Sequence, residues 1–448
     1  MTHQDALKQH YDDIESRVPV SRTGDYATLV TPNGNSAEPI HRWFHFKEAF
    51  SHRLLERVLK DEIDVSSDRH LSLFDPFVGS GTTGISAGQL IQAGVLRSAD
   101  FAGAECNPFL HMLSSAKLAA LQAPPSNFLT FAGAIAAAAN SSRARARPVS
   151  LSTFRNPSYF SPNALSRLTR LRLACDQFAE LADPTSKLLA GMCLAATVEP
   201  ASKLRRDGRT LRYSPGKIAR DPIAVFLEAA EKVQEDLSRV STPIRGSVSL
   251  LDVRQDSPEG AQVQADLALF SPPYPNNIDY TEVYKLELWA LGLIGNEGEF
   301  ASQRRKTLRS HGSLKWDERY DYQLGSSADE VQALIDPLIA AIPQNDRYSG
   351  ARRQLVMGYT DDMLKVVDRV KRTLRPGGVM ACIVGNSLHG KANEQLLIAA
   401  DLLIARLAEI VGLTVVRIEV ARRPTRRASY SEYLRESVVF ARLDGEVP

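Results

Sequence analysis

The feature that most constrains this chain is a glycine-containing turn between an apolar run and a helical pattern. The run 71–75 ends in Asp75 and is followed by Pro76-Phe77-Val78-Gly79-Ser80-Gly81-Thr82-Thr83. Gly79 and Gly81 allow a tight turn and the close approach of a ligand to the backbone. Amide groups at the start of the following helix would then face that ligand. A strand–turn–helix unit of this kind is typical of doubly wound α/β folds.

Further short apolar runs predict the other strands of such a sheet. Helical patterns lie between most of them, and this alternation favours a doubly wound α/β sheet with buried parallel strands. The predicted strands are 71–75, 101–105, 248–252, 266–271, 378–384, 413–419 and 437–442, and the predicted helices include 41–60, 83–94 and 363–374.

Two segments interrupt the alternation of strands and helices. Residues 121–245 contain several helical patterns and no clear strand, whereas residues 295–350 are polar and mixed. We therefore expect a polar lead-in over 1–38, a main α/β domain formed by 39–120 and 246–448, and a mostly helical insertion over 121–245.

Composition and charge exclude several classes of protein. Hydrophobic residues make up 44% and charged residues 24% of the chain, with a net charge of +2, which are ordinary values for a globular protein. No apolar run approaches the ~20 residues needed to span a bilayer. Residues 1–18 are polar and do not resemble a secretory signal, so a cytoplasmic location is expected. The four cysteines show no metal-ligand spacing, so neither a zinc site nor a disulfide framework is expected.

Two acidic residues indicate which cofactor the turn would bind. Glu105 ends the next predicted strand, where doubly wound folds place a carboxylate on ribose hydroxyls. Gly79, Gly81 and Gly84 also match the dinucleotide pattern G-x-G-x-x-G, which is weak evidence on its own. Asp75, however, would repel a diphosphate, and it suits the positively charged methionine end of S-adenosylmethionine.

A second motif, Ser271-Pro272-Pro273-Tyr274, follows the predicted strand 266–271. Two consecutive prolines fix the backbone just past a strand end, which in an open α/β sheet faces the ligand crevice. Such a loop holds carbonyls and a hydroxyl in place, and the tyrosine offers a stacking surface for a planar base. Methyl transfer to an exocyclic amine needs acceptors that orient the amine and an in-line donor, but no covalent nucleophile.

Together the two motifs resemble those of the amino-group DNA methyltransferases. Asp-Pro-Phe-x-Gly-x-Gly-Thr-Thr is similar to that family's cofactor motif, and Ser-Pro-Pro-Tyr to its catalytic motif in the form associated with N4-cytosine enzymes. The resemblance covers roughly residues 40–120 and 245–442. It implies a Rossmann-like methyltransferase fold, S-adenosylmethionine as the cofactor, and DNA as the partner, with the target base flipped out of the helix.

Other residues match this family more loosely. The resemblance implies cofactor contacts from His41, Trp43 and Phe46 in the segment 41–48, from Glu105 and Asn107, and from Asp252 at the adenine. Ser271, Pro272, Pro273 and Tyr274 would bind the target amine and base. The final two predicted strands resemble the reversed hairpin of the methyltransferase fold. Cognate restriction or defence proteins would be further partners.

Basic clusters predict where nucleic acid would bind. The segment 203–220 is rich in Lys and Arg with an interleaved tyrosine, which suits phosphates and exposed bases, and a second cluster lies between the last two strands. The predicted contacts are Lys203, Arg205, Arg206, Arg209, Arg212, Arg422, Arg423, Arg426 and Arg427. We also expect the insertion 121–245 to contribute to target recognition.

Three alternatives remain open at the level of sequence. The acceptor could be N6 of adenine, because the first residue of the catalytic motif is an imperfect guide to the base. The substrate could be RNA, because RNA base-amine methyltransferases use a similar Pro-Pro-aromatic loop. The chain could also be a nucleic-acid-binding protein without catalysis. A nicotinamide oxidoreductase is supported only by the glycine pattern and leaves 271–274 unexplained.

Overall fold

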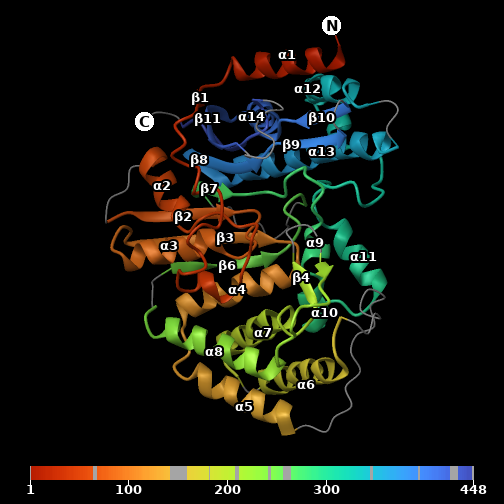
Figure 1. Ribbon diagram of the computed structural model, residues 1–448. Helices are drawn as coiled ribbons and strands as arrows, with labels where there is room; N and C mark the ends of the chain where they lie inside the picture. Colours follow the sequence, from red (N-terminus) through yellow and green to blue (C-terminus); the bar gives the residue numbers. More distant parts are fainter. Residues whose placement is uncertain are drawn as a thin grey trace.

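A single eight-stranded sheet forms the centre of the molecule (Figure 1). The computed structural model describes residues 2–63, 68–141, 159–180, 182–206, 211–240, 244–255, 264–343, 347–391, 394–423 and 432–445. The strands of the sheet are β1 (Val20–Ser21), β2 (His70–Asp75), β3 (Ser98–Glu105), β6 (Ile244–Leu250), β7 (Ala265–Phe270), β8 (Leu374–Gly385), β11 (Thr414–Arg422) and β12 (Glu436–Arg442).

The strand order confirms the predicted doubly wound, Rossmann-like fold. It is β1-β11-β12-β8-β7-β2-β3-β6. The five strands from β6 to β8 run parallel, and β12 lies antiparallel between β8 and β11 as the predicted reversed hairpin. Because β2, β3, β6 and β7 are parallel, their carboxyl ends meet at one edge of the sheet, which is where ligands bind in such folds.

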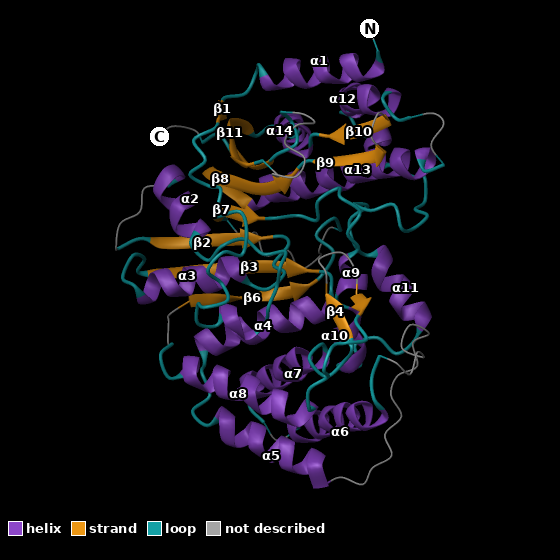
Figure 2. Cartoon of the chain, in the orientation of Figure 1, coloured by secondary structure: helices purple, strands orange, loops and turns teal. Residues whose placement is uncertain are grey.

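Helices cover both faces of the sheet, and the strands between them are buried on both sides. In β7, Leu267 and Leu269 join one hydrophobic core, whereas Ala268 and Phe270 join the other. The first core lies under α2 (Leu54–Glu62), α3 (Thr82–Gln92) and α4 (Pro108–Gln122), and the second under α1 (His3–Glu15), α12 (Ala328–Ala340), α13 (Ser349–Thr373) and α14 (Ala400–Ile410). Figure 2 shows the strands with helices packed around them. This double burial explains why the strands are continuous apolar runs in the sequence.

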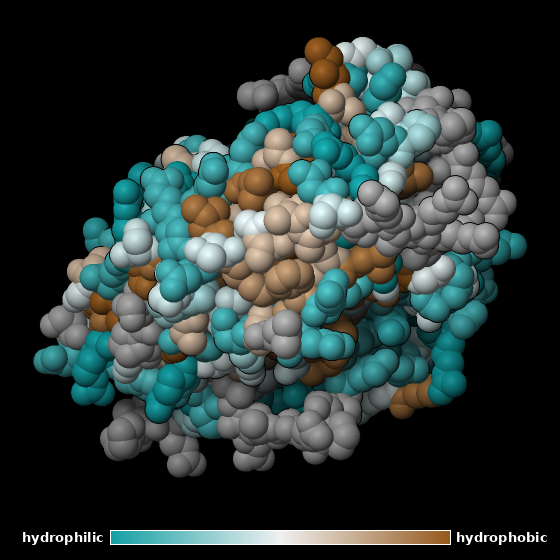
Figure 3. Space-filling view, turned by 90° about the horizontal axis from the view of Figure 1, so that it is seen from below, coloured by the Kyte–Doolittle hydropathy of each residue, from teal (hydrophilic) through white to brown (hydrophobic). Residues whose placement is uncertain are grey.

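The segment 121–245 is mostly helical, as predicted, and packs beneath α4 (Figure 1). It consists of α5 (Phe128–Ser141), α6 (Pro162–Ala179), α7 (Pro184–Val198), α8 (Pro222–Leu237), and the hairpin β4 (Leu204–Arg206) and β5 (Leu211–Tyr213). The sequence did not predict this hairpin. The face seen in Figure 3 mixes apolar and polar surface, and α5 and α6 contribute the exposed side chains Leu129 and Leu173.

Two sequence predictions about local structure are wrong in part. The expected helix 41–60 is a short η1 (His41–Trp43), a loop and then α2, because the aromatic residues of the loop pack individually instead of on one helix face. The lead-in 1–38 is not only a polar segment, since Leu7, Tyr11 and Ile14 of α1 are buried and β1 extends the sheet. The expected helix 363–374 is confirmed as the last part of α13, which begins earlier, at Ser349.

The polar segment 295–350 also contains regular structure. After α9 (Tyr280–Val283) and α10 (Lys285–Ala290) come α11 (Glu297–Arg305), η3 (Asp321–Leu324) and α12, and β9 (Ser387–Lys391) pairs with β10 (Glu394–Ile398) beyond β8. Among the described residues, no helix is both long and apolar enough to cross a membrane.

Candidate active site

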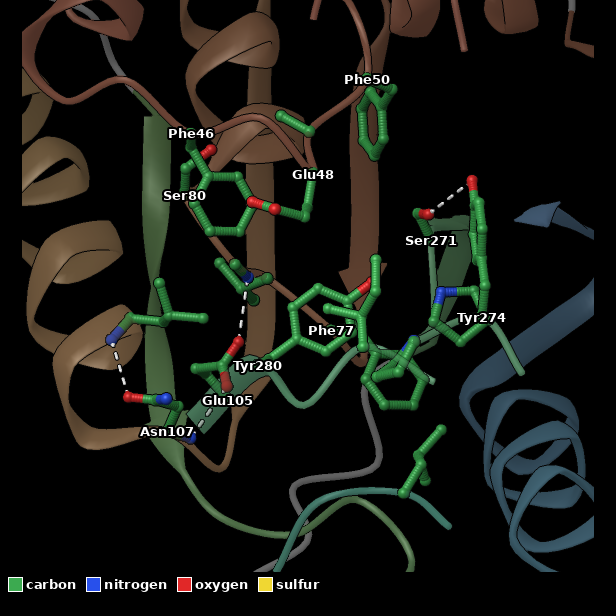
Figure 4. A pocket seen from close by; sticks show the side chains of 18 of the residues that line it. Phe46, Glu48, Phe50, Phe77, Ser80, Glu105, Asn107, Ser271, Tyr274 and Tyr280 are labelled. Carbon is green, nitrogen blue, oxygen red and sulfur yellow. Dashed lines mark hydrogen bonds between the residues drawn. The ribbon is translucent and has the colours of Figure 1, made fainter. Parts of the chain in front are cut away.

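A cavity of about 230 Å³ lies at the carboxyl ends of β2, β3, β6 and β7, and both sequence motifs line it (Figure 4). The glycine turn contributes Pro76, Phe77, Val78, Gly79, Ser80 and Thr82, and the second motif contributes Ser271, Pro272, Pro273 and Tyr274. Residues almost 200 positions apart are therefore brought to one site. Neither motif alone shows that the glycine turn and the 271–274 loop lie side by side.

The glycine turn has the backbone geometry that its sequence predicts. Gly79 has φ +52° and Gly81 has φ +87°, a region that L side chains rarely adopt. A Cβ on Gly79 would lie 3.3 Å from the ring of Phe46. The absence of a side chain at Gly79 therefore leaves room for the Phe46 ring, which packs over the turn beside the cavity.

Asp75 supports this turn from inside the protein. Its carboxylate accepts hydrogen bonds from the amide of Phe77 (2.9 Å) and from the hydroxyl of Thr83 (2.7 Å), and its side chain is buried. Burial raises the pKa of Asp75 to about 7. Neither Asp75, Thr83 nor Gly81 lines the cavity. The prediction that Asp75 faces the cofactor is corrected accordingly, because both carboxylate oxygens bind the turn.

Glu105 and Asn107 line the cavity on the side of β3, as predicted. The carboxylate of Glu105 accepts from the amides of Gly79 (3.0 Å) and Asn107 (2.8 Å), and burial raises its pKa to about 7. The side-chain oxygen of Asn107 caps α4 by accepting from the amide of Phe109 (3.0 Å). Its Nδ2 is buried and has no hydrogen-bond partner among the described residues. This buried donor beside the cavity is therefore available for a hydrogen bond to a ligand or a water molecule.

Asp252 also lines the cavity, just beyond the end of β6. Its carboxylate is held by Arg254, with Oδ1 accepting from Nε (2.9 Å) and Oδ2 from Nη2 (2.6 Å). Arg254 donates further to Asp362 of α13 (2.8 Å). Asp252 therefore has a fixed orientation, in which an arginine neutralises its charge.

The segment 41–48 contributes only its second half to the cavity. Phe46 stacks on Tyr284 at 5.3 Å between ring centroids, and the Tyr284 hydroxyl donates to Glu48 (2.5 Å). His41 and Trp43 do not line the cavity, and their predicted cofactor contacts are corrected. The His41 ring contacts Gln89 (3.2 Å), and the Trp43 indole donates to Asp236 of α8 (2.8 Å). Both side chains therefore support the fold.

The loop after β7 holds its tyrosine in a defined position. The Tyr274 hydroxyl donates to Glu436 (2.9 Å), and the Ser271 hydroxyl lies 3.4 Å from it. Burial and the Glu436 carboxylate raise the pKa of Tyr274 well above its usual value, so the phenol is neutral at physiological pH. Further along the loop, the Pro275 carbonyl contacts Ser387 (2.7 Å) and His389 (2.8 Å).

Several cavity residues were missed by the sequence analysis. Tyr280, at the start of α9, places its ring between Glu105 and the 271–274 loop in Figure 4. Glu436 and Lys306 line the cavity as well, at the start of β12 and just after α11. No local motif marks Tyr280 or Glu436, whereas Lys306 belongs to a basic cluster of the sequence that also contains Arg304, Arg305 and Arg309.

The predicted nucleic-acid contacts divide into four groups, of which the fourth is the buried Arg206. Arg205 and Arg212 on the β4–β5 hairpin are exposed, Lys203 is partly exposed, and Arg423 is exposed after β11. Arg422 lines the cavity, where its Nε donates to Glu436 (2.6 Å). Arg209, Arg426 and Arg427 lie outside the described residues.

Arg206 is a correction to the predicted nucleic-acid contacts. Its side chain is only 6% exposed and donates to Glu287 (2.6 Å), with the guanidinium 4.7 Å from the ring centre of Tyr284. A cation held in this way supports the packing of α10 against the hairpin and is not free to bind phosphate.

Comparison with known proteins places the chain beside methyltransferases. No protein-family model matches the chain. It is 23% identical over 438 residues to the Type II methyltransferase M.BsoBI of Geobacillus stearothermophilus, a match that covers 87% of this chain and 82% of the relative. It is 22% identical over 471 residues to the Type II methyltransferase M.AvaI of a Nostoc strain, covering 96% of this chain and 89% of the relative.

Among solved structures, the similarity is weak. The rRNA methyltransferase aviRa from Streptomyces viridochromogenes aligns with 88% of this chain and 86% of its own at 12% identity, with a TM-score of 0.31. The fold assignment therefore rests on the strand order described above. The sequence relatives, aligned along nearly the whole chain, support a methyltransferase.

Proposed function

We propose that the chain is an S-adenosylmethionine-dependent DNA methyltransferase that methylates an exocyclic amino group, N4 of cytosine. The observation that carries this proposal is that the glycine turn and the 271–274 loop line one cavity. A cofactor on the turn and a base at the loop would meet there. The similarity to Type II methyltransferases along most of the chain supports DNA as the substrate and a role beside a restriction endonuclease.

The residues on one side of the cavity fit S-adenosylmethionine. Glu105 is placed to accept hydrogen bonds from ribose hydroxyls, and the unpaired Nδ2 of Asn107 is a donor for an acceptor atom of the cofactor. The turn at Gly79 lets the ligand approach the backbone, and Phe46 closes over it. When bound, the cofactor supplies a methyl group activated by the sulfonium charge.

The other side of the cavity would hold the target amine. We assign the Ser271 hydroxyl and the Pro272 carbonyl as acceptors for the two amine N–H bonds, which directs the nitrogen lone pair into the cavity. Tyr274 would stack on the flipped base. The neutral amine would attack the methyl carbon directly as the bond from that carbon to sulfur breaks, which would release S-adenosylhomocysteine and then a proton from the methylated amine. The site therefore needs no ionised nucleophile, and the raised pKa of Tyr274 is consistent with a binding role.

The β4–β5 hairpin is the surface that we assign to DNA. It lies beside α9 and α10, where Arg206 donates to the Val283 carbonyl and to Glu287, at the edge of the sheet where the parallel strands end (Figure 1). Arg205 and Arg212 are exposed on it, and Tyr213, the neighbour of Arg212 on β5, is 38% exposed. Phosphate contacts from this hairpin would position the duplex over the cavity.

A transfer assay tests the proposal. Purified protein is incubated with labelled S-adenosylmethionine and unmethylated DNA, and the digested nucleosides are separated by mass spectrometry. N4-methylcytosine is the expected product, whereas N6-methyladenine would correct the base alone. Label on RNA and none on DNA would overturn the substrate, and no label together with no cofactor binding would overturn the enzyme.

A further inference from the structure

We propose that Glu436 is a positioning residue that fixes the ring of Tyr274 for the target base. This inference rests on the proposed function, in which Tyr274 contacts the base. Glu436 belongs to neither sequence motif and lies 162 residues beyond Tyr274, at the first position of β12. Its side chain nevertheless reaches the cavity and binds the tyrosine hydroxyl.

Tyr274 packs against residues that pair with one another across three neighbouring strands of the sheet. Glu436 pairs with Gly385 of β8 on one side and with Arg422 of β11 on the other. A Cβ on Gly385 would lie 2.8 Å from the Tyr274 ring, so the ring packs directly on the backbone of β8. The Tyr274 ring is therefore held by two contacts. Its face packs on Gly385, and its hydroxyl binds Glu436, which Arg422 in turn holds in place.

Both carboxylate oxygens of Glu436 accept hydrogen bonds in this arrangement. Oε1 accepts from the Tyr274 hydroxyl (2.9 Å), and Oε2 accepts from Nε of Arg422 (2.6 Å). The Glu436 side chain is only 12% exposed, and Arg422 balances its charge. A hydrogen bond from a phenol to a carboxylate is stronger than one between neutral groups. The pair thus restricts the ring to one orientation before any substrate binds.

The orientation of the ring matters because stacking works only over a narrow range of positions. If the hydroxyl loses its acceptor, the ring is free to rotate about its side-chain bonds and to lose its packing on the Gly385 backbone. A displacement of about 1 Å in a positioning group lowers rates by roughly a hundredfold. We therefore expect Glu436→Ala to lower kcat by about a hundredfold, with the affinity for S-adenosylmethionine unchanged.

A double-mutant cycle separates positioning from other roles. Tyr274→Phe keeps the ring and removes the hydroxyl through which Glu436 acts. The double variant Tyr274→Phe with Glu436→Ala should therefore have the same kcat as Glu436→Ala alone. Asp368→Ala, which removes an exposed acid paired with Arg372 on α13, is the control for loss of an acidic side chain. The proposal is wrong if the losses of kcat caused by Tyr274→Phe and by Glu436→Ala multiply in the double variant, or if Glu436→Ala keeps the wild-type kcat.

A second readout does not depend on methylation. The same cycle is measured as the shift in Tm, where coupled residues give a double variant less destabilised than the sum of the two single variants. A wild-type protein that methylates no nucleic acid would refute the proposed function, and the Tm cycle would still test the contact. Additive shifts in Tm would refute the coupling between Tyr274 and Glu436 even in an active enzyme.

Discussion

The unpaired side-chain nitrogen of Asn107 gives the sharpest test of the cofactor site. The Asn107 oxygen caps α4, whereas its Nδ2 is buried beside the cavity without a partner in the described part of the chain. The substitution Asn107→Ser separates these two functions. Serine is about as good an N-cap as asparagine, so the helix keeps its cap while the amide donor is lost.

The expected loss of affinity follows from the energy of one buried hydrogen bond. A bond that forms only when the cofactor binds contributes about 1 to 2 kcal/mol, including the cost of leaving the ligand's acceptor unpaired. The dissociation constant of Asn107→Ser for S-adenosylmethionine should therefore rise about 5- to 30-fold. The Tm of the free protein should stay close to that of the wild type.

Isothermal titration calorimetry with S-adenosylmethionine measures this change, and thermal denaturation checks the fold. Asp183→Ser is the matched control, because the Asp183 side chain caps α7 by accepting from the amide of Ser186 (2.9 Å) and does not line the cavity. This variant should bind the cofactor normally. Wild-type affinity in Asn107→Ser would refute the assignment of the Nδ2 donor to the cofactor.

Four further outcomes are expected. Tyr274→Ala should abolish methyl transfer and leave the calorimetric affinity for S-adenosylmethionine intact; a parallel loss of cofactor binding would contradict its assignment to the base. Glu105 must be ionised to accept ribose hydroxyls, and burial raises its pKa to about 7. Affinity should therefore be full above pH 7 and fall as the pH drops, by about tenfold per unit well below the pKa, and a flat profile would exclude this role. Replacing Arg205 and Arg212 with Ala should reduce the salt dependence of DNA binding by about 1.8 in log–log slope, and an unchanged slope would exclude both as phosphate contacts. Arg206→Ala should destabilise the protein by about 3 to 5 kcal/mol, and an unchanged Tm would contradict its structural role.

The sheet and the glycine turn were predictable because their signals are local. Strands buried on both faces, such as β7, are short apolar runs, and β2 ends directly before the Gly79–Gly81 turn. The preference of glycine for positive φ is a property of the residue itself, so the turn could be located from sequence alone.

The errors arise where distant residues decide the outcome. Arg206 looks like part of a basic surface, but Glu287 and Tyr284, some 80 residues later, bury it. Trp43 lies in a cofactor-like segment, yet Asp236 of the insertion binds its indole. Glu436 has no sequence motif at all, and only the pairing of β12 with β8 brings it to Tyr274. Long-range pairing of this kind leaves no pattern in the neighbouring sequence.

The account's central claim is that one cavity holds both the methyl donor and the target base. A crystal structure of the protein with S-adenosylhomocysteine and a duplex containing its target site would test this claim most directly. We predict that the ribose lies at Glu105, the sulfur faces the 271–274 loop, and a flipped base stacks on Tyr274 with its amine at Ser271. A cofactor bound elsewhere, or a base extruded away from this loop, would contradict the account.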